Sequence, residues 1–260
     1  MKVFLVNPEV CNGCYNCQVA CKDEHCGNDW SPYAKTQPDT GQFWCRLEEK
    51  VRGTVPLTRM SYYPVIGAQD EAIREYAPEV IQEREDGIIV IDPEKAAGRK
   101  DIAEKFEGVY WNEALQIPQG CTGCAHLLDN GWTVPRCVDA CMTDAIKWVD
   151  EADLPAGAEK LSEGSHVYYI NFPKRFVGAT VVDYAADEVV IGAKVTLKDC
   201  DGAVVAETLT DDFGDFIFKQ VDAAVYEVIV EKAGYMTQLV SADATDVDVN
   251  LNYIDFKPTV

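Results

Sequence analysis

Near its N-terminus the chain reads Cys11-Asn12-Gly13-Cys14-Tyr15-Asn16-Cys17-Gln18-Val19-Ala20-Cys21, a C-x2-C-x2-C-x3-C run. Ferredoxins hold cubane iron–sulfur clusters with this spacing. The first three cysteines lie on one tight, Gly-containing loop and can present three thiolates to one cube. Cys21 follows at the start of an expected helix from Val19 to Glu24, and so points away toward a second cube.

A second cysteine group reads Cys121-x2-Cys124-x12-Cys137-x3-Cys141. Each group is incomplete for its own cluster and can donate one ligand to the other, as in two-cluster ferredoxins. The spacing therefore predicts two [4Fe-4S] clusters that use eight cysteines with none left over. Cluster 1 is assigned to Cys11, Cys14, Cys17 and Cys141. Cluster 2 is assigned to Cys21, Cys121, Cys124 and Cys137.

Zinc and disulfides are the alternatives for these cysteines. The second group on its own also fits a four-cysteine zinc site. The first group does not, because zinc ligand pairs are usually separated by a longer stretch than two residues on both sides. Taken together, the two groups favour iron–sulfur clusters. A disulfide framework is disfavoured, because eleven cysteines in 260 residues are too sparse for a stapled scaffold.

Composition restricts the partners. The chain is 47% hydrophobic, enough for one large or two ordinary domains. Its 44 acidic and 23 basic residues give a net charge of −21, which disfavours nucleic acid and anionic membranes. No apolar run approaches the ~20 residues needed to span a bilayer, so no membrane insertion is expected. Residues 1–6 run toward Cys11 as a short strand without a twin-Arg or Sec signal, which together with reduced thiolates predicts a cytoplasmic location.

Four residues that often bind metals fall outside the ligand pattern. Cys26, Cys45 and Cys200 are expected to be free structural thiols, the first two of them buried. His25 is expected to cap or pack, because the eight cysteines already complete both clusters. The sequence shows no nucleophile–base arrangement, phosphate loop or dinucleotide fingerprint. No catalytic residue is therefore predicted, and the chain is not expected to be an enzyme on its own.

Three stretches carry a resemblance to a known family. They are Cys11 to Cys21, Glu85-Asp86-Gly87-Ile88-Ile89-Val90-Ile91-Asp92-Pro93-Glu94-Lys95, and Cys121-Thr122-Gly123-Cys124-Ala125-His126-Leu127-Leu128-Asp129. On these the chain resembles the iron–sulfur subunits of molybdopterin oxidoreductases over nearly its whole length. It is most similar to their transhydroxylase branch, which also carries a C-terminal β-domain. The resemblance implies a large molybdopterin-dependent catalytic subunit as partner, with molybdopterin expected only in that partner.

The chain departs from this family between its two cysteine groups. Family members have a second ferredoxin module there with further clusters, whereas residues 60–110 contain no cysteine. We therefore expect a degenerate module without metal. Because protein interiors are close-packed, we expect side chains to fill its centre and to pack against the strand Ile88 to Ile91. The expected filling residues are Tyr62, Tyr63, Val65, Ile66, Tyr76, Phe106, Val109 and Tyr110.

The composition changes after residue 150. Residues 151–175 are predicted to be a connector, and residues 176–260 show short alternating strands separated by Asp–Gly turns. This pattern predicts an all-β sandwich or barrel, similar to transthyretin-like or Cna-B-like domains. Its Asp residues are expected to form turns rather than bind calcium, because no twelve-residue calcium-loop spacing is present. The predicted fold class is thus α+β, with a ferredoxin-like iron–sulfur domain over 1–150 followed by the all-β domain.

The predicted function is electron transfer by two [4Fe-4S] clusters beside a molybdenum or tungsten–pterin catalytic subunit. On the resemblance, that subunit acts on a small phenolic substrate by hydroxylation, dehydroxylation or transhydroxylation. An alternative is a structural and interaction subunit whose clusters stabilise the fold, because cluster ligation contributes folding energy. The redox-neutral reaction of the transhydroxylases supports that alternative. A subunit of a respiratory or dehydrogenase complex is disfavoured by the missing clusters.

Overall fold

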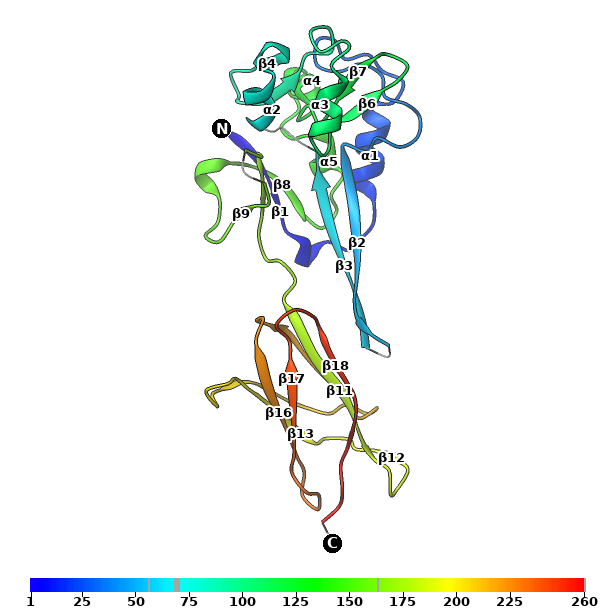
Figure 1. Ribbon diagram of the computed structural model, residues 1–260, viewed down its shortest axis with the longest axis vertical. Helices are drawn as coiled ribbons and strands as arrows, with labels where there is room; N and C mark the ends of the chain where they lie inside the picture. Colours follow the sequence, from blue (N-terminus) through cyan, green and yellow to red (C-terminus); the bar gives the residue numbers. More distant parts are fainter. Residues whose placement is uncertain (56, 68–70, 163, 260) are drawn as a thin grey trace. The chain divides into compact units, whose positions relative to one another are not determined.

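The computed structural model describes residues 1–55, 57–67, 71–162 and 164–259, and it divides into two compact units (Figure 1). Unit 1 comprises Met1–Glu49 and Ser61–Phe172, and unit 2 comprises Lys50–Met60 and Pro173–Val260. The predicted fold class is confirmed, with helices and strands mixed in unit 1 and strands alone in the C-terminal part. Among the described residues, no helix is both long and apolar enough to cross a bilayer.

Unit 1 contains short elements. Its helices are α1 (Asn16–His25), α2 (Glu71–Tyr76), α3 (Lys100–Lys105), α4 (Ala125–Asp129) and α5 (Arg136–Asp139), with 3-10 turns η1 (Pro8–Val10), η2 (Pro78–Val80) and η3 (Glu151–Asp153). Its strands are β1 (Lys2–Val6), β4 (Ile81–Glu83), β5 (Ile89–Ile91), β6 (Tyr110–Asn112), β7 (Ile117–Gln119), β8 (Ile146–Asp150), β9 (Glu159–Lys160) and β10 (Val167–Tyr169). The hairpin of β2 (Cys45–Thr54) and β3 (Leu57–Ile66) has its base in unit 1 and its tip in unit 2.

One small sheet brings the two cysteine groups together. Its strand order is β8-β1-β10-β9, with β1 antiparallel to β8 and parallel to β10. Phe4 of β1 is fully buried, and its ring packs on Trp148 of β8 with a centroid distance of 4.6 Å. Because β1 leads into Cys11 and β8 follows Cys141, this pairing places the start of one cysteine group beside the end of the other.

The region 60–110 is a separate small core, apart from Ala68–Asp70, which lie outside the described residues. Phe106 and Val109 pack with Ile89 and Ile91 of β5, as expected. The rest of the packing prediction is wrong in part. Ile66 and Tyr110 join the buried cluster that contains the cysteines instead of packing against β5. Tyr76 is 41% exposed, contacts the Phe106 ring edge-on, and donates its hydroxyl to Asp101 Oδ2 at 3.0 Å.

Unit 2 is a two-sheet β-sandwich. One sheet has the order β12-β11-β15 with β18 also paired to β11, and the other has the order β14-β13-β16-β17. Their bounds are β11 (Arg175–Asp183), β12 (Glu188–Val189), β13 (Lys194–Lys198), β14 (Val204–Leu209), β15 (Asp215–Val221), β16 (Val225–Glu231), β17 (Gln238–Asp243) and β18 (Val249–Asp255). Alternate residues such as Val195, Leu197, Val228 and Val230 are fully buried between the sheets, which matches the period of two expected of half-buried strands.

The turns of unit 2 use Asp as predicted. The Asp199 Oδ1 atom accepts the backbone N–H groups of Asp201 and Ala203. The Asp211 Oδ1 atom accepts those of Phe213 and Asp215 in the same way. These are local turns closed by a side-chain oxygen, so the prediction of a turn-forming role is confirmed for both residues.

A buried ion pair holds the hairpin tip within unit 2. Arg52 Nε lies 2.8 Å from Asp248 Oδ2, and the same carboxylate accepts the N–H of Phe176 at 3.0 Å. The Asp248 side chain is only 4% exposed. We expect Arg52→Ala to destabilise unit 2 by about 3 kcal/mol, because it leaves a buried carboxylate without its cation.

Amide hydrogen exchange of β11 and β18 measures the loss of stability in unit 2 caused by Arg52→Ala, and it uses no signal from unit 1. Arg59→Ala is the matched control, because Arg59 is an exposed arginine of the same hairpin. Equal exchange rates in the two variants would show that the pair adds nothing to the stability of unit 2.

Candidate iron–sulfur site

The first cysteine group lies on a loop that ends in α1. Asn12 Oδ1 accepts the Cys14 N–H at 3.2 Å, and Tyr15 caps the helix in a left-handed conformation. Gly13 has a φ of 73°, and a Cβ there would come within 2.5 Å of the Tyr62 ring. Tyr62 therefore covers the cysteine loop, and does not pack against β5 as the sequence suggested. The loop shape requires glycine both for its backbone angle and for this close approach.

The second group straddles two short helices. Cys121 and Cys124 precede α4, Cys137 lies in α5, and Cys141 follows it before β8. Helix α5 packs against α1, which carries Cys17 and Cys21. Cys17 and Cys21 are four residues apart on α1, so both lie on the same face of this helix. The contact between α1 and α5 therefore brings the first cysteine group close to the second.

The thiols come together in two sets, each drawn from both groups. Cys11 interacts electrostatically with Cys14, Cys17 and Cys141. The other set is centred on Cys21 and Cys124, which interact with each other and with Cys121 and Cys137. Cys21 also interacts, less strongly, with Cys17 of the first set. These sets have the same members as the two predicted ligand sets, and we call them the outer set and the inner set. In the outer set Cys14 is exposed and Cys11 and Cys141 are half-buried, whereas Cys21, Cys124 and Cys137 of the inner set are buried.

Within the described residues, no three His, Cys, Asp or Glu side chains are placed to hold one metal ion. A zinc site needs four ligands on one ion, each sulfur at about 2.3 Å, whereas the four thiolates of a cubane bind four different iron atoms.

The surroundings of the sulfurs fit an iron–sulfur cluster. The N–H of Gly123 points to Cys121 Sγ and that of Arg136 to Cys124 Sγ, both at 3.4 Å. The backbone also donates to the sulfurs of Cys11, Cys17 and Cys21. Such N–H donors stabilise the negative charge that thiolate ligands carry. The part of the chain that the structure describes also holds buried donors without a partner, among them Trp44 Nε1 and Thr122 Oγ1.

Burial controls the protonation of the free thiols. Burial, and next the nearby Cys137 thiol, raises the pKa of Cys21 well above its ordinary value. Burial likewise raises the pKa of Cys124. By contrast, a hydrogen bond from Cys45 is the main cause that lowers the pKa of Cys17. Without iron the Cys21 and Cys124 thiols are therefore held protonated, and metal binding must release those protons.

Two residues outside the ligand pattern lie at the site. His25 is buried and its Nδ1 lies 2.8 Å from the Cys21 carbonyl oxygen, which confirms the predicted packing and capping role. Cys45 is buried as predicted, but its position between the two sets was not visible in the sequence. Its thiol hydrogen-bonds with Cys17 and Cys137, and these bonds are the main cause of its strongly raised pKa. No spacing rule relates Cys45 to either group, so only the fold could reveal this contact.

The other two thiols outside the ligand pattern belong to neither set. Cys26 is half-buried, so the prediction that it is buried is wrong. The reason is its place at the C-terminal end of α1, where its sulfur lies 3.3 Å from the Asp39 carboxylate. Cys200 is exposed and lies in unit 2.

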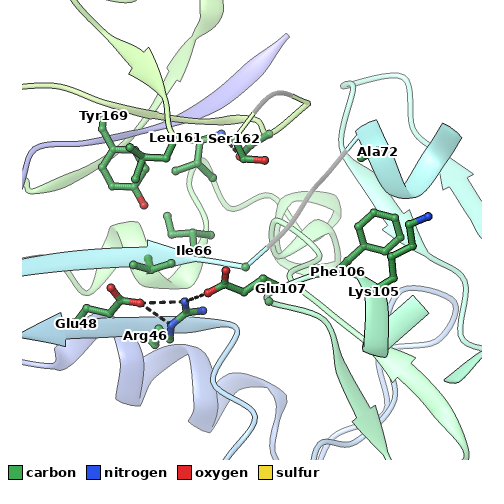
Figure 2. Close-up of a pocket in the computed structure, with 15 residues that line it drawn as sticks. Arg46, Glu48, Ile66, Ala72, Lys105, Phe106, Glu107, Leu161, Ser162 and Tyr169 are labelled. Carbon is green, nitrogen blue, oxygen red and sulfur yellow. Dashed lines mark hydrogen bonds and ion pairs between the residues drawn. The ribbon is translucent and has the colours of Figure 1, made fainter. Parts of the chain in front are cut away.

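A separate pocket of about 550 Å³ lies in unit 1 between residues 65–67 and 105–108 (Figure 2). Figure 2 shows Arg46 pointing toward two carboxylates, with ion pairs of 3.0 Å to Glu48 and 2.6 Å to Glu107. No cysteine is among its described lining residues. Ile66 and Phe106 line this pocket together with residues outside the module, such as Arg46 and Tyr169, so the pocket lies at the edge of the module. The interior of the module is filled by buried side chains, as expected.

Comparison with protein families identifies both parts of the chain. Residues 68–151 match the 4Fe-4S dicluster domain, a stretch that includes the whole second cysteine group. Residues 177–253 match the carboxypeptidase regulatory-like domain, which coincides with the β-sandwich. The iron–sulfur part and the all-β part are thus recognised independently of each other.

Individual relatives cover more of the chain. The pyrogallol hydroxytransferase small subunit of Pelobacter acidigallici is 33% identical over 252 residues, which is 89% of this chain and 90% of that subunit. One chain of the anaerobic dimethyl sulfoxide reductase of Escherichia coli (strain K12) is 25% identical over 170 residues, covering 57% of this chain and 74% of that one. The major pilin subunit BcpA of Bacillus cereus, with a TM-score of 0.29 and 18% identity, covers 36% of this chain and 32% of its own.

Proposed function

Because this protein belongs to the family of iron–sulfur small subunits of molybdopterin oxidoreductases, together with the pyrogallol hydroxytransferase small subunit, we propose that it carries electrons through two [4Fe-4S] clusters. The observation that carries the proposal is the grouping of eight thiols into two sets of four, each with one cysteine from the other group. Cluster 1 takes Cys11, Cys14, Cys17 and Cys141. Cluster 2 takes Cys21, Cys121, Cys124 and Cys137.

Some residues of the chain would bind the clusters, and others would stabilise their charge or limit the access of water. When bound, a [4Fe-4S] cluster supplies one-electron redox chemistry. The cysteine thiolates hold it, and the backbone N–H groups of Gly123 and Arg136 offset negative charge on the Cys121 and Cys124 sulfurs. The burial of Cys21, Cys124 and Cys137 limits the access of water to the inner set, while the exposed Cys14 leaves the outer set open to a partner.

The partner in this proposal is a large molybdopterin-dependent subunit that acts on a small phenolic substrate in the cytoplasm. Exposed apolar side chains support docking at the outer set. Val10 is 43% exposed, Val19 62% and Met142 72%. Val10 and Met142 adjoin Cys11 and Cys141, and Val19 lies on α1 between Cys17 and Cys21. A surface that places apolar side chains around a redox centre suits burial against another subunit.

The structural alternative remains a second candidate, since the ligands join α1 to α5 and would cross-link unit 1 whether or not electrons pass. Potentiometry separates the two functions. Clusters that are reduced and reoxidised within the biological range, about −700 to +450 mV, support electron transfer. Clusters that cannot be reduced in that range support a structural role.

Metal analysis tests the cluster count. We expect anaerobically purified protein to bind about eight iron and eight sulfide per chain, because two cubes contain that number. Cys200→Ala, which removes an exposed thiol of unit 2, should bind the same amount. Twelve or more iron per chain would contradict the two-cluster assignment, and four would leave only one cluster.

Substitution of the apolar rim tests the docking surface. We expect Met142→Asp to weaken copurification with the large subunit tenfold or more, because burying a methionine contributes about 1.5–3 kcal/mol. Val19→Asp should act in the same direction. Leu115→Asp is the control, since Leu115 is likewise exposed to solvent, in the β6–β7 turn, but adjoins no cysteine. Equal losses in all three variants would place the interface elsewhere.

A further inference from the structure

Cys45 is the residue that touches both thiol sets. It is 1% exposed and packs in one buried cluster with Cys17, Cys21 and Cys137. Its thiol lies within hydrogen-bonding reach of Cys17 in the outer set and of Cys137 in the inner set. Its backbone N–H also donates to the sulfur of Cys21. Cys45, which belongs to neither set, is therefore surrounded by the sulfurs of Cys17, Cys21 and Cys137.

The backbone around Cys45 is fixed by hydrogen bonds on both sides. The Leu47 N–H donates to Gln18 Oε1 of α1 at 2.8 Å, which ties the start of β2 to the helix that carries Cys17 and Cys21. The Gly67 N–H donates to the Trp44 carbonyl oxygen at 2.6 Å, which ties the same point to the end of β3. The thiol is thus held between the sets by its own strand.

A second donor on the same segment has no partner. Trp44 is 2% exposed in the same buried cluster, and its indole Nε1 makes no hydrogen bond within the described part of the protein. Leaving a buried N–H without an acceptor is costly, so such a group usually indicates an acceptor that the protein alone does not provide. Cluster sulfide is an acceptor of this kind. The segment Trp44–Cys45 therefore carries two buried donors within the cluster of side chains that contains the cysteines.

We propose that Cys45 is a positioning residue whose S–H lies between the Cys17 and Cys137 sulfurs, donates its single hydrogen to them in turn and thereby raises the reduction potentials of both clusters, an inference that rests on the proposed function. Hydrogen bonds to the sulfurs of a cluster are among the factors that set its potential. The added electron increases negative charge on the ligand sulfurs, so a donor stabilises the reduced form more than the oxidised form. The proton stays on the Cys45 sulfur, and no bond to iron forms.

Redox titration of Cys45→Ala tests this role. We expect unchanged iron content and a more negative midpoint potential for both clusters. A tenfold change in the reduction equilibrium corresponds to about 59 mV for one electron. Cys45→Ser keeps a donor of nearly the same size and should recover most of the shift. Cys200→Ala is the control and should leave both potentials unchanged, because Cys200 is an exposed thiol of unit 2.

The possible results of the redox titration distinguish a failure of this inference from a failure of the proposed function. Unchanged potentials in Cys45→Ala would overturn the inference alone. The loss of a cluster from both Cys45→Ala and Cys45→Ser would overturn it too, because Cys45 would then be a ligand. If unaltered protein binds no clusters, the proposed function fails instead.

If only Cys45→Ala fails to bind its clusters, its potentials cannot be measured. Infrared spectroscopy of the unaltered protein then tests whether the Cys45 S–H donates a hydrogen bond. Hydrogen bonding lowers the frequency of an S–H stretch. We expect one S–H band to move to lower frequency when the clusters are reduced, to disappear in Cys45→Ser and to persist in Cys200→Ala. The absence of any redox-dependent S–H band would overturn the inference.

Discussion

Cys21→Ser is expected to damage the cluster held with the distant residues Cys121, Cys124 and Cys137, and to spare the one beside Cys11. About four of the eight iron atoms should be lost, because each cube contains four. The reason is the direction of α1, which places Cys17 in the outer set and Cys21 in the inner set. Sequence proximity would suggest the opposite result, so the variant is a sharp test.

Cys141→Ser is the reciprocal change and should damage the cluster near the N-terminus. Mössbauer and EPR spectra of the two variants should each show the cluster that the other has lost. Cys26→Ser is the matched control, because Cys26 directly follows α1 and contacts Asp39 rather than either set. Loss of the same cluster from both variants, or damage confined to the local group, would refute the exchange of ligands.

Removal of iron is expected to unfold unit 1 and to leave the sandwich of unit 2 intact. Helices α4 and α5 have five and four residues, far below the length at which a helix is stable alone. Their positions depend on Cys124 and Cys137, so without metal little holds them in place. The core of unit 2 is made of apolar side chains such as Leu197 and Val228 and uses no predicted ligand.

Tryptophan fluorescence distinguishes the two units without labels. All five tryptophans of the chain, Trp30, Trp44, Trp111, Trp132 and Trp148, lie in unit 1. After chelation of the iron we expect their emission to approach that of urea-unfolded protein, while the two segments of unit 2, Lys50–Met60 and the part from Pro173 onward, resist proteolysis together. Native-like emission in the metal-free protein would show that the clusters contribute little to the fold. It would also remove the physical basis of the structural alternative.

Local patterns in the sequence were sufficient for most elements of the fold, whereas the division of the ligands stays a prediction. The C-x2-C-x2-C-x3-C run specifies a loop and a helix within eleven residues, and its spacing together with the second group predicts two ligand sets of four. Alternating residues in the C-terminal part likewise predicted the sandwich that is found. Both follow from short-range rules, since helix and strand periods are properties of neighbouring residues.

Only the tertiary structure decided how distant segments meet. Ile66 and Tyr110 were expected beside β5 but pack with the cysteines, and Ile66 also lines a pocket at the edge of the degenerate module. Cys45 had no motif to distinguish it from any buried thiol, yet the hairpin of β2 and β3 places it between Cys17 and Cys137. The physical reason is that an apolar pattern states which side chains are buried, but not against which partners. That choice depends on the closure of the whole chain, which the β1–β8 pairing and the α1–α5 contact bring about.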